Sequence, residues 1–353
     1  MRNDADRVGG EPVKVALVGL GYWGEKILRN LATLVGPRGV VAADSRVERL
    51  ERFRDLYPGL TFVTSLDVAL EHDDVTAVVV ATPVESHAGL ARRALEADRH
   101  VLVEKPLAAS SAEAHELAIL GRDRGLTVMV GHTFLFSPRL DAVKAAVETD
   151  RVGRLHYVTT SRLNLGLYRR DINVIWDLAP HDFSIIFHVL GQFPELVQTT
   201  AQSSVHAGAP DVAFISLTFP SGAIASVTVS WRSPLKVRNA VLVGDKGMIL
   251  YDDTQPDEPV KIYDRGVVSM ESANFGEHQL TYRYGDTVAP HIVATEPLSV
   301  ELQHFLSCIE TRQPCLSDAW FGLEVVRALE AADRSWRAGG VPVPISRVSQ
   351  RSA

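Results

Sequence analysis

The sequence has little of the features that would assign its class at once. Its 353 residues include only two cysteines, Cys308 and Cys315, which lack the Cys-x-x-Cys spacing of zinc and redox motifs. No stretch approaches the ~18 uninterrupted apolar residues of a membrane span. Lys and Arg number 36 against 43 Asp and Glu, so the net charge of −7 offers no overall positive field to a phosphate backbone. We therefore expect no membrane and no nucleic-acid partner.

Residues 1–12 are polar and charged, without the apolar stretch of an export signal. We expect a flexible tail there and, together with the sparse cysteines, a cytoplasmic location. Hydrophobic residues make up 46% of the chain and charged residues 22%, which is ordinary for a folded protein in solution. The length predicts two domains.

The first part of the chain alternates short β-branched runs with amphipathic segments of helical length, such as 85–98. The runs lie at residues 13–19, 39–44, 77–82, 100–105 and 126–131. Such alternation is typical of a parallel sheet with crossover helices, and continuous apolar strands indicate burial on both faces. The sequence predicts a doubly wound α/β domain over residues 13–135.

The texture changes after residue 136. Alternating segments follow at residues 155–165, 212–219, 222–231 and 239–253, and two amphipathic helices at 298–310 and 319–339. Alternation is typical of an antiparallel sheet with one covered face. Residues 254–297 are polar and weakly periodic, and we expect loops there. The sequence predicts a second, α+β domain over residues 136–345.

The first run leads into GLGYWG, where Gly19, Gly21 and Gly24 have the G-x-G-x-x-G spacing between a strand and a helix. This spacing permits a pyrophosphate to approach a helix amino terminus. Asp44 closes the next strand 20 residues after Gly24 (44 − 24), where a carboxylate can bind a ribose 2′-hydroxyl. The pattern favours NAD over NADP, because a carboxylate repels a 2′-phosphate. Arg46 could approach such a phosphate or be a solvated loop residue.

Glu104, Lys105 and Pro106 end the run at 100–105. They lie at the carboxyl end of a buried strand, the edge at which open α/β sheets bind ligands. Spacing alone leaves Lys105 open to two interpretations, a solvated strand end or a catalytic group.

The stretch WDLAPHDF allows three interpretations. As metal ligands on one helix, Asp177 and His188 would lie roughly 16 Å apart at ~1.5 Å per residue, too far to share an ion; we predict no metal site. As a helix start, Asp177 would be the N-cap and Pro180 would lie in the first turn, which leaves His181 as a core histidine. As an acid–base site, His181 would accept a hydroxyl proton.

The motifs GLGYWG, ATPVESH, EKP and Asp-x-x-x-His, in this order, resemble the Gfo/Idh/MocA oxidoreductase family, the glucose–fructose oxidoreductase and inositol dehydrogenase group. The resemblance covers about residues 12–340. It implies a Rossmann domain followed by an α+β domain with a large, mostly antiparallel sheet through which copies associate as dimers or tetramers.

The resemblance also implies site residues. Lys105, Asp177 and His181 match the catalytic positions, and the Lys105–Pro106 peptide matches a cis bond. His181 would remove a hydroxyl proton as hydride leaves, Lys105 would stabilise the alkoxide, and Asp177 would hold Lys105 or a substrate hydroxyl. The cofactor-binding residues that we expect are Gly19, Gly21, Tyr22, Trp23, Gly24, Asp44, Ser45, Arg46, Thr82, Pro83, His87, Glu104 and Lys105.

Residues 161–182 contain the substrate candidates. Arginines suit phosphate oxygens and asparagines suit hydroxyls, although solvated loop residues are an alternative for Arg169 and Arg170. NVIWDLAPHD resembles a branch of the family that oxidises the C3 hydroxyl of UDP-hexoses. Two alternatives stay open: an inositol, aminocyclitol or free-sugar dehydrogenase or ketoreductase, and a dinucleotide-binding regulator without turnover. The substrate-binding residues that we expect are Arg162, Asn164, Asn173, Trp176 and His181.

Overall fold

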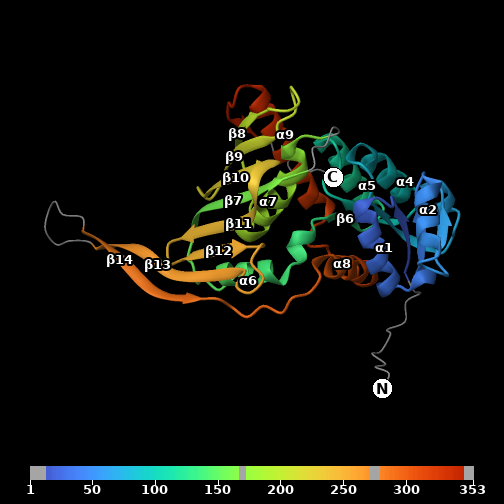
Figure 1. Ribbon diagram of the computed structural model, residues 1–353, viewed down its shortest axis with the longest axis horizontal. Helices are drawn as coiled ribbons and strands as arrows, with labels where there is room; N and C mark the ends of the chain where they lie inside the picture. The colour runs from blue at the N-terminus through green and yellow to red at the C-terminus, as the bar shows by residue number, and fades with distance from the viewer. Residues whose placement is uncertain (1–12, 167–171, 271–278, 346–353) are drawn as a thin grey trace, which may run out of the picture. The chain divides into compact units, whose positions relative to one another are not determined.

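The computed structural model describes residues 13–166, 172–270 and 279–345 (Figure 1). The chain divides into two compact units. Unit 1 combines the chain up to Thr133 with Glu296–Val326, and unit 2 combines Phe134–Thr295 with the chain from Arg327 onward. No helix among the described residues has the length and apolar character needed to cross a membrane.

The division differs from the sequence-based domains over residues 296–326, which we expected in the second domain. They belong to unit 1 because helix α8 (Pro297–Thr311) packs against helix α1 (Tyr22–Leu34). Asn30 on α1 donates a hydrogen bond of 3.2 Å to Glu296 just before α8. Contacts between segments so far apart in the chain leave no local mark in the sequence.

Unit 1 contains, within the described residues, a six-stranded parallel sheet in the order β3-β2-β1-β4-β5-β6. The strands are β1 Lys14–Val18, β2 Val40–Ala43, β3 Thr61–Val63, β4 Val75–Val80, β5 His100–Glu104 and β6 Val128–Gly131. The other helices are α2 Val47–Arg54, α3 Leu66–Leu70, α4 His87–Glu96 and α5 Ser111–Asp123, with short 3-10 turns η1 Pro37–Gly39, η2 Val84–Ser86 and η3 Thr133–Phe136. The chain order reverses between β1 and β4, and ligands bind at such a reversal in open α/β sheets.

Unit 2 contains, as far as it is described, a nine-stranded sheet in the order β14-β13-β12-β11-β7-β10-β9-β8-β15. Its strands are β7 Leu155–Leu165, β8 Leu196–Gln202, β9 Val212–Thr218, β10 Ile224–Ser230, β11 Arg232–Gly244, β12 Met248–Asp252, β13 Val260–Met270, β14 Gln279–Val288 and β15 Val343–Pro344. All its described pairings are antiparallel except that of β7 with β10. The predicted fold class is thereby confirmed.

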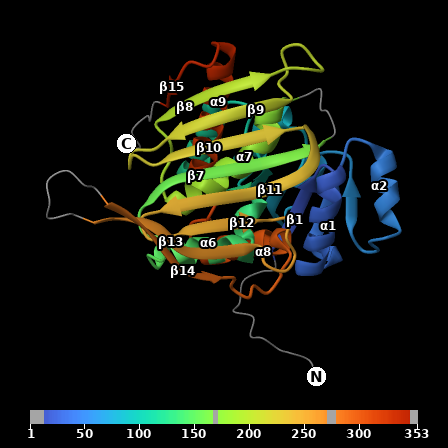
Figure 2. The same cartoon turned by 60° about the vertical axis from the view of Figure 1, so that its left-hand side comes forward.

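Helices cover one face of this sheet (Figure 2). Helix α7 (Val174–Leu190) packs on β7 and β10, and α6 (Pro138–Glu148) packs on β12 and β13. Helix α9 (Ala319–Arg337) begins in unit 1 and ends in unit 2. Its last turns join the sheet through Ser335, whose Oγ accepts a 2.8 Å hydrogen bond from the Thr199 amide.

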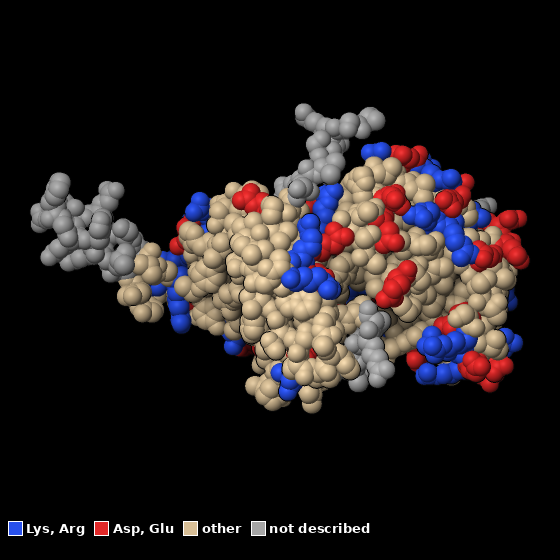
Figure 3. Space-filling model, turned by 90° about the horizontal axis from the view of Figure 1, so that it is seen from above, with Lys and Arg blue, Asp and Glu red and all other residues tan. Residues whose placement is uncertain are grey.

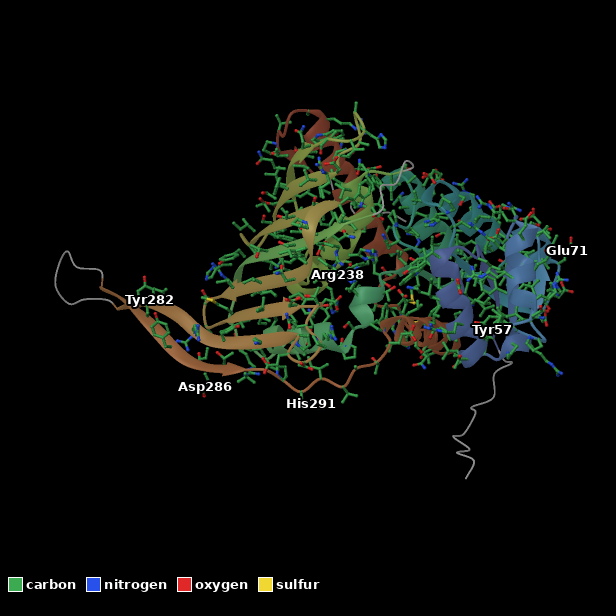
Figure 4. All side chains as sticks on the ribbon, viewed as in Figure 1. Tyr57, Glu71, Arg238, Tyr282, Asp286 and His291 are labelled. Carbon is green, nitrogen blue, oxygen red and sulfur yellow. The ribbon has the colours of Figure 1, made fainter. Side chains whose placement is uncertain are left out.

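The prediction of loops over residues 254–297 was wrong, because this stretch contains β13 and β14. Their hairpin lies at the edge of the sheet, and Tyr282 (labelled in Figure 4) and Tyr284 of β14 are exposed. Asp286 and Thr287, on opposite sides of the strand, are exposed as well. Over its described residues β14 therefore lacks the apolar alternation that marks a strand with one buried face, and β13 has it only at its start, where Val260 and Ile262 are buried.

The predicted start of α7 was also wrong. The helix begins one turn earlier, with Asn173 as its N-cap: the Asn173 side chain accepts hydrogen bonds from the amides of Ile175 (3.0 Å) and Trp176 (3.1 Å). Pro180 lies inside the helix and not in its first turn. Asn and Asp are comparable N-caps, so the residue type alone does not decide between positions 173 and 177.

Candidate active site

The glycine turn after β1 has the geometry of a pyrophosphate cradle. Gly19 has a φ of +99°, and a Cβ on Gly24 would lie 1.9 Å from the Gly19 carbonyl oxygen. Gly21 is the N-cap of α1, and a Cβ there would meet no described heavy atom within 4 Å. The outer glycines therefore allow the tight turn, while the middle one leaves the helix amino terminus open to an anion.

Asp44 follows β2 and is held by three hydrogen bonds. Its carboxylate accepts from the amides of Leu20 (2.8 Å) and Arg46 (2.9 Å) and from Arg49 Nη1 (3.0 Å). Burial alone would raise the pKa of Asp44, but these three hydrogen bonds outweigh it and hold the pKa below its usual value. Asp44 is thus a fixed carboxylate with a cation, Arg49, that the sequence analysis did not single out.

The remaining predicted cofactor residues near the glycine turn differ in exposure. Tyr22 is 80% exposed, and its hydroxyl accepts a 3.0 Å hydrogen bond from Lys26 Nζ. Ser45 and Arg46 are exposed on the loop before α2, whereas Trp23 is half-buried. All of them lie in unit 1 with Asp44.

His87 connects the loops that follow β4 and β5. It is 1% exposed, with Nε2 2.8 Å from the Thr82 carbonyl oxygen and Nδ1 2.8 Å from that of Pro106. Burial lowers the pKa of His87, against the effect of the two carbonyls. Its ring therefore joins the Thr82–Pro83 turn to the peptide next to Lys105. The Thr82 hydroxyl lies 2.7 Å from that of Ser86.

Lys105 follows the end of β5, and the Lys105–Pro106 peptide is cis, as the resemblance implied. Burial raises the pKa of the neighbouring Glu104 to about 7, although the Lys105 ammonium group and the Trp23 indole oppose this rise. Gly131 on β6 lies opposite Glu104, and a Cβ there would come within 3.2 Å of Glu104 Oε1. The glycine leaves the space that the Glu104 carboxyl fills.

Three further polar residues of unit 1, His132, Thr133 and Glu301, were not predicted. Glu301 on α8 is 1% exposed and accepts a 2.9 Å hydrogen bond from the Thr133 hydroxyl. Burial and the negative charge of Glu104 raise the pKa of Glu301 well above its usual value. Burial and the Lys105 charge lower the pKa of His132 to about 3. For Glu301 the sequence contained a signal, because it is an acidic residue on the apolar face of the helix expected at 298–310.

Helix α7 presents the predicted acid–base pair in unit 2. Asp177 and His181 are four residues apart and therefore lie on one helix face. Asp177 Oδ2 accepts a 3.1 Å hydrogen bond from the Trp231 indole. The half-buried His181 ring packs edge-on against Phe134, with 5.0 Å between ring centroids.

Two of the predicted substrate residues, Arg162 and Asn173, make hydrogen bonds to carboxylates within unit 2. Arg162 is 6% exposed, and its Nε donates a 2.9 Å hydrogen bond to Asp182 while its guanidinium stacks 4.6 Å from the Phe134 ring centroid. Burial raises the pKa of Asp182, against the pull of Arg162. Asn173 caps α7 and donates a 3.0 Å hydrogen bond to Asp333.

Asn164 and Trp176 are half-buried, and Arg169 and Arg170 lie outside the described residues. The catalytic candidates are divided, with Lys105 in unit 1 and Asp177 and His181 in unit 2. Their common action on one substrate stays a prediction.

The chain matches two models of one family. The model described as an oxidoreductase family with an NAD-binding Rossmann fold matches residues 13–132, and that of the GFO/IDH/MocA C-terminal domain matches residues 140–250. A 4-carboxy-2-hydroxymuconate-6-semialdehyde dehydrogenase of Sphingobium sp. is 30% identical over 268 residues, which cover 71% of this chain and 84% of that protein. An inositol 2-dehydrogenase of Rhizobium meliloti is 25% identical over 334 residues, covering 92% and 96%.

Among solved structures, the UDP-N-acetylglucosamine 3-dehydrogenase GnnA from Acidithiobacillus ferrooxidans has a TM-score of 0.74 at 22% identity, covering 92% of this chain and 98% of that one. At this identity the likeness shows the fold alone. The first family model covers the glycine turn and describes its domain as an NAD-binding Rossmann fold. The two relatives align with 71% and 92% of the chain. The chain belongs to the Gfo/Idh/MocA oxidoreductase family.

Proposed function

We propose that this protein transfers a hydride between NAD and a secondary hydroxyl, C3 of a nucleotide-activated hexose such as a UDP-sugar, to give a 3-keto sugar. The observation that carries the proposal is the pair on α7: Asp177 and His181 share a helix face, and Asp177 is held by the Trp231 indole. A fixed carboxylate next to a half-buried histidine suits removal of a hydroxyl proton.

Separate residues would bind the cofactor, remove the hydroxyl proton and stabilise the developing negative charge. When bound, NAD supplies the hydride acceptor. The open amino terminus of α1 at Gly21 holds the pyrophosphate, and Asp44 accepts from a ribose hydroxyl. His181 takes the substrate hydroxyl proton, and Lys105 donates a hydrogen bond to the same oxygen as negative charge develops. Asp177 orients Lys105 or a neighbouring substrate hydroxyl.

The choice of a nucleotide sugar rests on two likenesses. The stretch NVIWDLAPHD, Asn173 to Asp182, resembles the nucleotide-sugar branch of the family, and GnnA, named for such an activity, has a similar fold. Because Arg162 is paired with Asp182, this candidate requires that groups other than Arg162 bind the diphosphate.

A second candidate is a dehydrogenase for an uncharged polyol such as an inositol or aminocyclitol. The buried Arg162–Asp182 pair favours it, because the one predicted phosphate ligand that the structure describes is engaged. The inositol 2-dehydrogenase relative points to the same class.

The deciding experiment follows the absorbance of reduced nicotinamide after the protein is mixed with NAD or NADP and a panel of UDP-hexoses, inositols and free sugars. A partner aminotransferase removes any 3-keto product. Reduction with one UDP-sugar supports the first candidate, and reduction with a free polyol transfers the assignment to the second. Confirmed NAD binding without reduction across the panel contradicts both and favours the regulator.

We also propose that copies associate through the open face of the large sheet. Tyr157, Phe214 and Ile224 are exposed on neighbouring strands of this face, with relative exposures of 38%, 55% and 56%. Exposed apolar patches of this kind mark interaction sites. Figure 3, a view from above and not onto this face, shows fewer Lys, Arg, Asp and Glu side chains over unit 2 than over unit 1. Light scattering of Phe214→Lys against wild type tests this association, and an unchanged mass contradicts it.

A further inference from the structure

Three metal-ligating side chains that the proposed reaction does not use meet at the carboxyl end of α8. His304 and Cys308 lie one helical turn apart, and Cys315 returns from the loop before α9. One ring nitrogen and the two sulfur atoms all lie within 4.8 Å of one another. The chain reverses at Arg312, which has a left-handed φ of 57°, so two cysteines without a metal-motif spacing come together.

The distances are close to those of a tetrahedral zinc site. Cys308 Sγ lies 3.4 Å from His304 Nε2. Zn–S bonds of about 2.3 Å and Zn–N bonds of about 2.0–2.1 Å place sulfur and nitrogen roughly 3.6 Å apart in a tetrahedron, and two sulfurs about 3.8 Å apart. Even the widest gap that the 4.8 Å limit allows needs to close by only about 1 Å.

His304 is in the form that binds metals. The Leu316 amide donates a 3.0 Å hydrogen bond to His304 Nε2, so Nε2 carries the lone pair and Nδ1 carries the proton. This lone pair is on the ring atom next to Cys308 Sγ, and an ion would take it in place of the amide.

Both thiols are buried, since Cys308 is 3% exposed and Cys315 is 8% exposed. A bound cation stabilises thiolates and releases their protons, so it would compensate the negative charge at these two buried sulfur atoms.

The cluster borders a cavity on its Cys315 side. Cys315 and Asp318 line this cavity of about 900 Å³ in unit 1, together with Arg312 and Pro314. The connection it borders is anchored on β6, where Ser317 Oγ donates a 2.7 Å hydrogen bond to the Val130 carbonyl.

We propose that His304, Cys308 and Cys315 form a structural binding site for a thiophilic divalent cation, Zn²⁺, with the fourth position taken by water. The ion ties the end of α8 to the start of α9, and through Ser317 to β6. The site is independent of the proposed reaction, because no group assigned to NAD or substrate takes part.

The test begins with metal-free full-length protein titrated with Co²⁺, whose spectrum reports its ligands. We expect one equivalent with tetrahedral ligand-field bands and a sulfur-to-cobalt charge-transfer band, both abolished by one equivalent of Zn²⁺. Because each metal-bound thiolate releases a proton, the affinity should rise with pH. Failure to bind one equivalent, or binding without the charge-transfer band, overturns the proposal and leaves hydrogen-bonded thiols only.

Variants assign the ligands. We expect each of the variants Cys308→Ser, Cys315→Ser and His304→Gln to weaken Zn²⁺ binding at least ~100-fold. Even substitution of residues that only hydrogen-bond a metal ligand lowers metal affinity 10–100-fold. His291→Gln, at an exposed histidine labelled in Figure 4, is the matched control and should bind like wild type. Unchanged affinity in the three ligand variants contradicts the assignment.

A measurement on wild-type protein guards against variants that fail to fold. Alkylation of Cys315, followed by peptide mass spectrometry, should slow at least ~10-fold with Zn²⁺ relative to Mg²⁺, because a coordinated thiolate is shielded from the reagent. Equal alkylation rates with the two ions overturn the proposal without any substitution.

Discussion

In unit 2 a buried arginine, Arg162, is paired with the buried carboxylate of Asp182, whereas in unit 1 the buried carboxyls of Glu104 and Glu301 repel each other. The unit 2 pair satisfies both charges with a 2.9 Å hydrogen bond. The unit 1 pair has Thr133 on one carboxyl and the Lys105 charge near the other. Burying charged groups costs desolvation free energy in both pairs, but only in the Arg162–Asp182 pair does the attraction between the two partners offset that cost.

The difference indicates different roles. A paired buried charge holds two elements in register, here β7 and α7. Buried groups with strongly shifted pKa values, such as Glu104, raised to about 7, and His132, lowered to about 3, are typical of sites that handle protons or ligands. We therefore expect substitutions in unit 1 to change chemistry and pH dependence, and substitutions of the unit 2 pair to change stability.

The largest effect is expected from Lys105→Ala. Loss of the group that stabilises the developing alkoxide should lower turnover on the order of 10³- to 10⁴-fold, the upper range for general acid–base groups. NAD should still bind. Stopped-flow reduction of NAD with the substrate found by the panel measures this, with the exposed Lys246→Ala as control. Near-normal turnover removes Lys105 from the mechanism.

In unit 2, Arg162→Met should lower the free energy of unfolding by about 3–4 kcal/mol, because it leaves Asp182 buried without its cation. Burial already raises the pKa of Asp182, so the loss should shrink at low pH, where this carboxyl takes up a proton. Urea unfolding measures it. The double variant Arg162→Met with Asp182→Leu should recover part of the loss.

The exposed pair of Arg92 and Glu116 supplies the comparison. Arg92→Met should cost under about 1 kcal/mol, as exposed ion pairs contribute little. A similar cost at both arginines would mean that burial of the Arg162 pair has no energetic consequence, and the contrast between the units would fail.

In unit 1, Glu301→Gln should change the pH dependence of stability. The raised pKa of Glu301 means that the folded state keeps a proton that the unfolded state loses above about pH 4.5, so stability falls as pH rises toward the folded-state pKa. Glutamine lacks this titration and can still accept from Thr133. Relative to wild type, the variant should therefore become progressively more stable as the pH rises from 5 to 8.

The matched control is Glu310→Gln, at an exposed position of the same helix. It should give the same pH profile as wild type in the same urea titrations. A constant difference between Glu301→Gln and wild type across this range would show that Glu301 is ionised in the folded protein.

The parts of this comparison that were predictable are local in the sequence. The apolar run at 77–82 predicted β4, and the run at 100–105 predicted a strand that ends near Lys105. A continuous apolar run must be buried on both faces, so it reports its own surroundings. The glycine spacing likewise encodes the turn that it forms.

What could not be predicted depends on partners distant in the chain. The partner of Arg162, Asp182, lies 20 residues away on α7, and no local pattern in the sequence indicates that they meet. Substrate binding by Arg162 stays a prediction. Glu301 becomes a neighbour of Glu104 only because α8 returns to unit 1. Asn173 caps α7 in place of Asp177, a choice between similar side chains that packing decides.

Asp44 tests the comparison at its weakest point, because it is a paired buried carboxylate in unit 1. If its bonds to Leu20, Arg46 and Arg49 were purely structural, Asp44→Ala would weaken NAD and NADP equally. If Asp44 also accepts from the ribose, NAD binding should weaken roughly 10- to 150-fold, the value of one charge-assisted hydrogen bond. NADP binding should weaken less, because the repulsion of its 2′-phosphate is lost and Arg49 is released. The ratio of the two dissociation constants, measured by fluorescence titration, decides between these outcomes. Asp44→Asn, which keeps a side-chain acceptor but not the charge, should move the ratio in the same direction, because repulsion of the phosphate depends on charge.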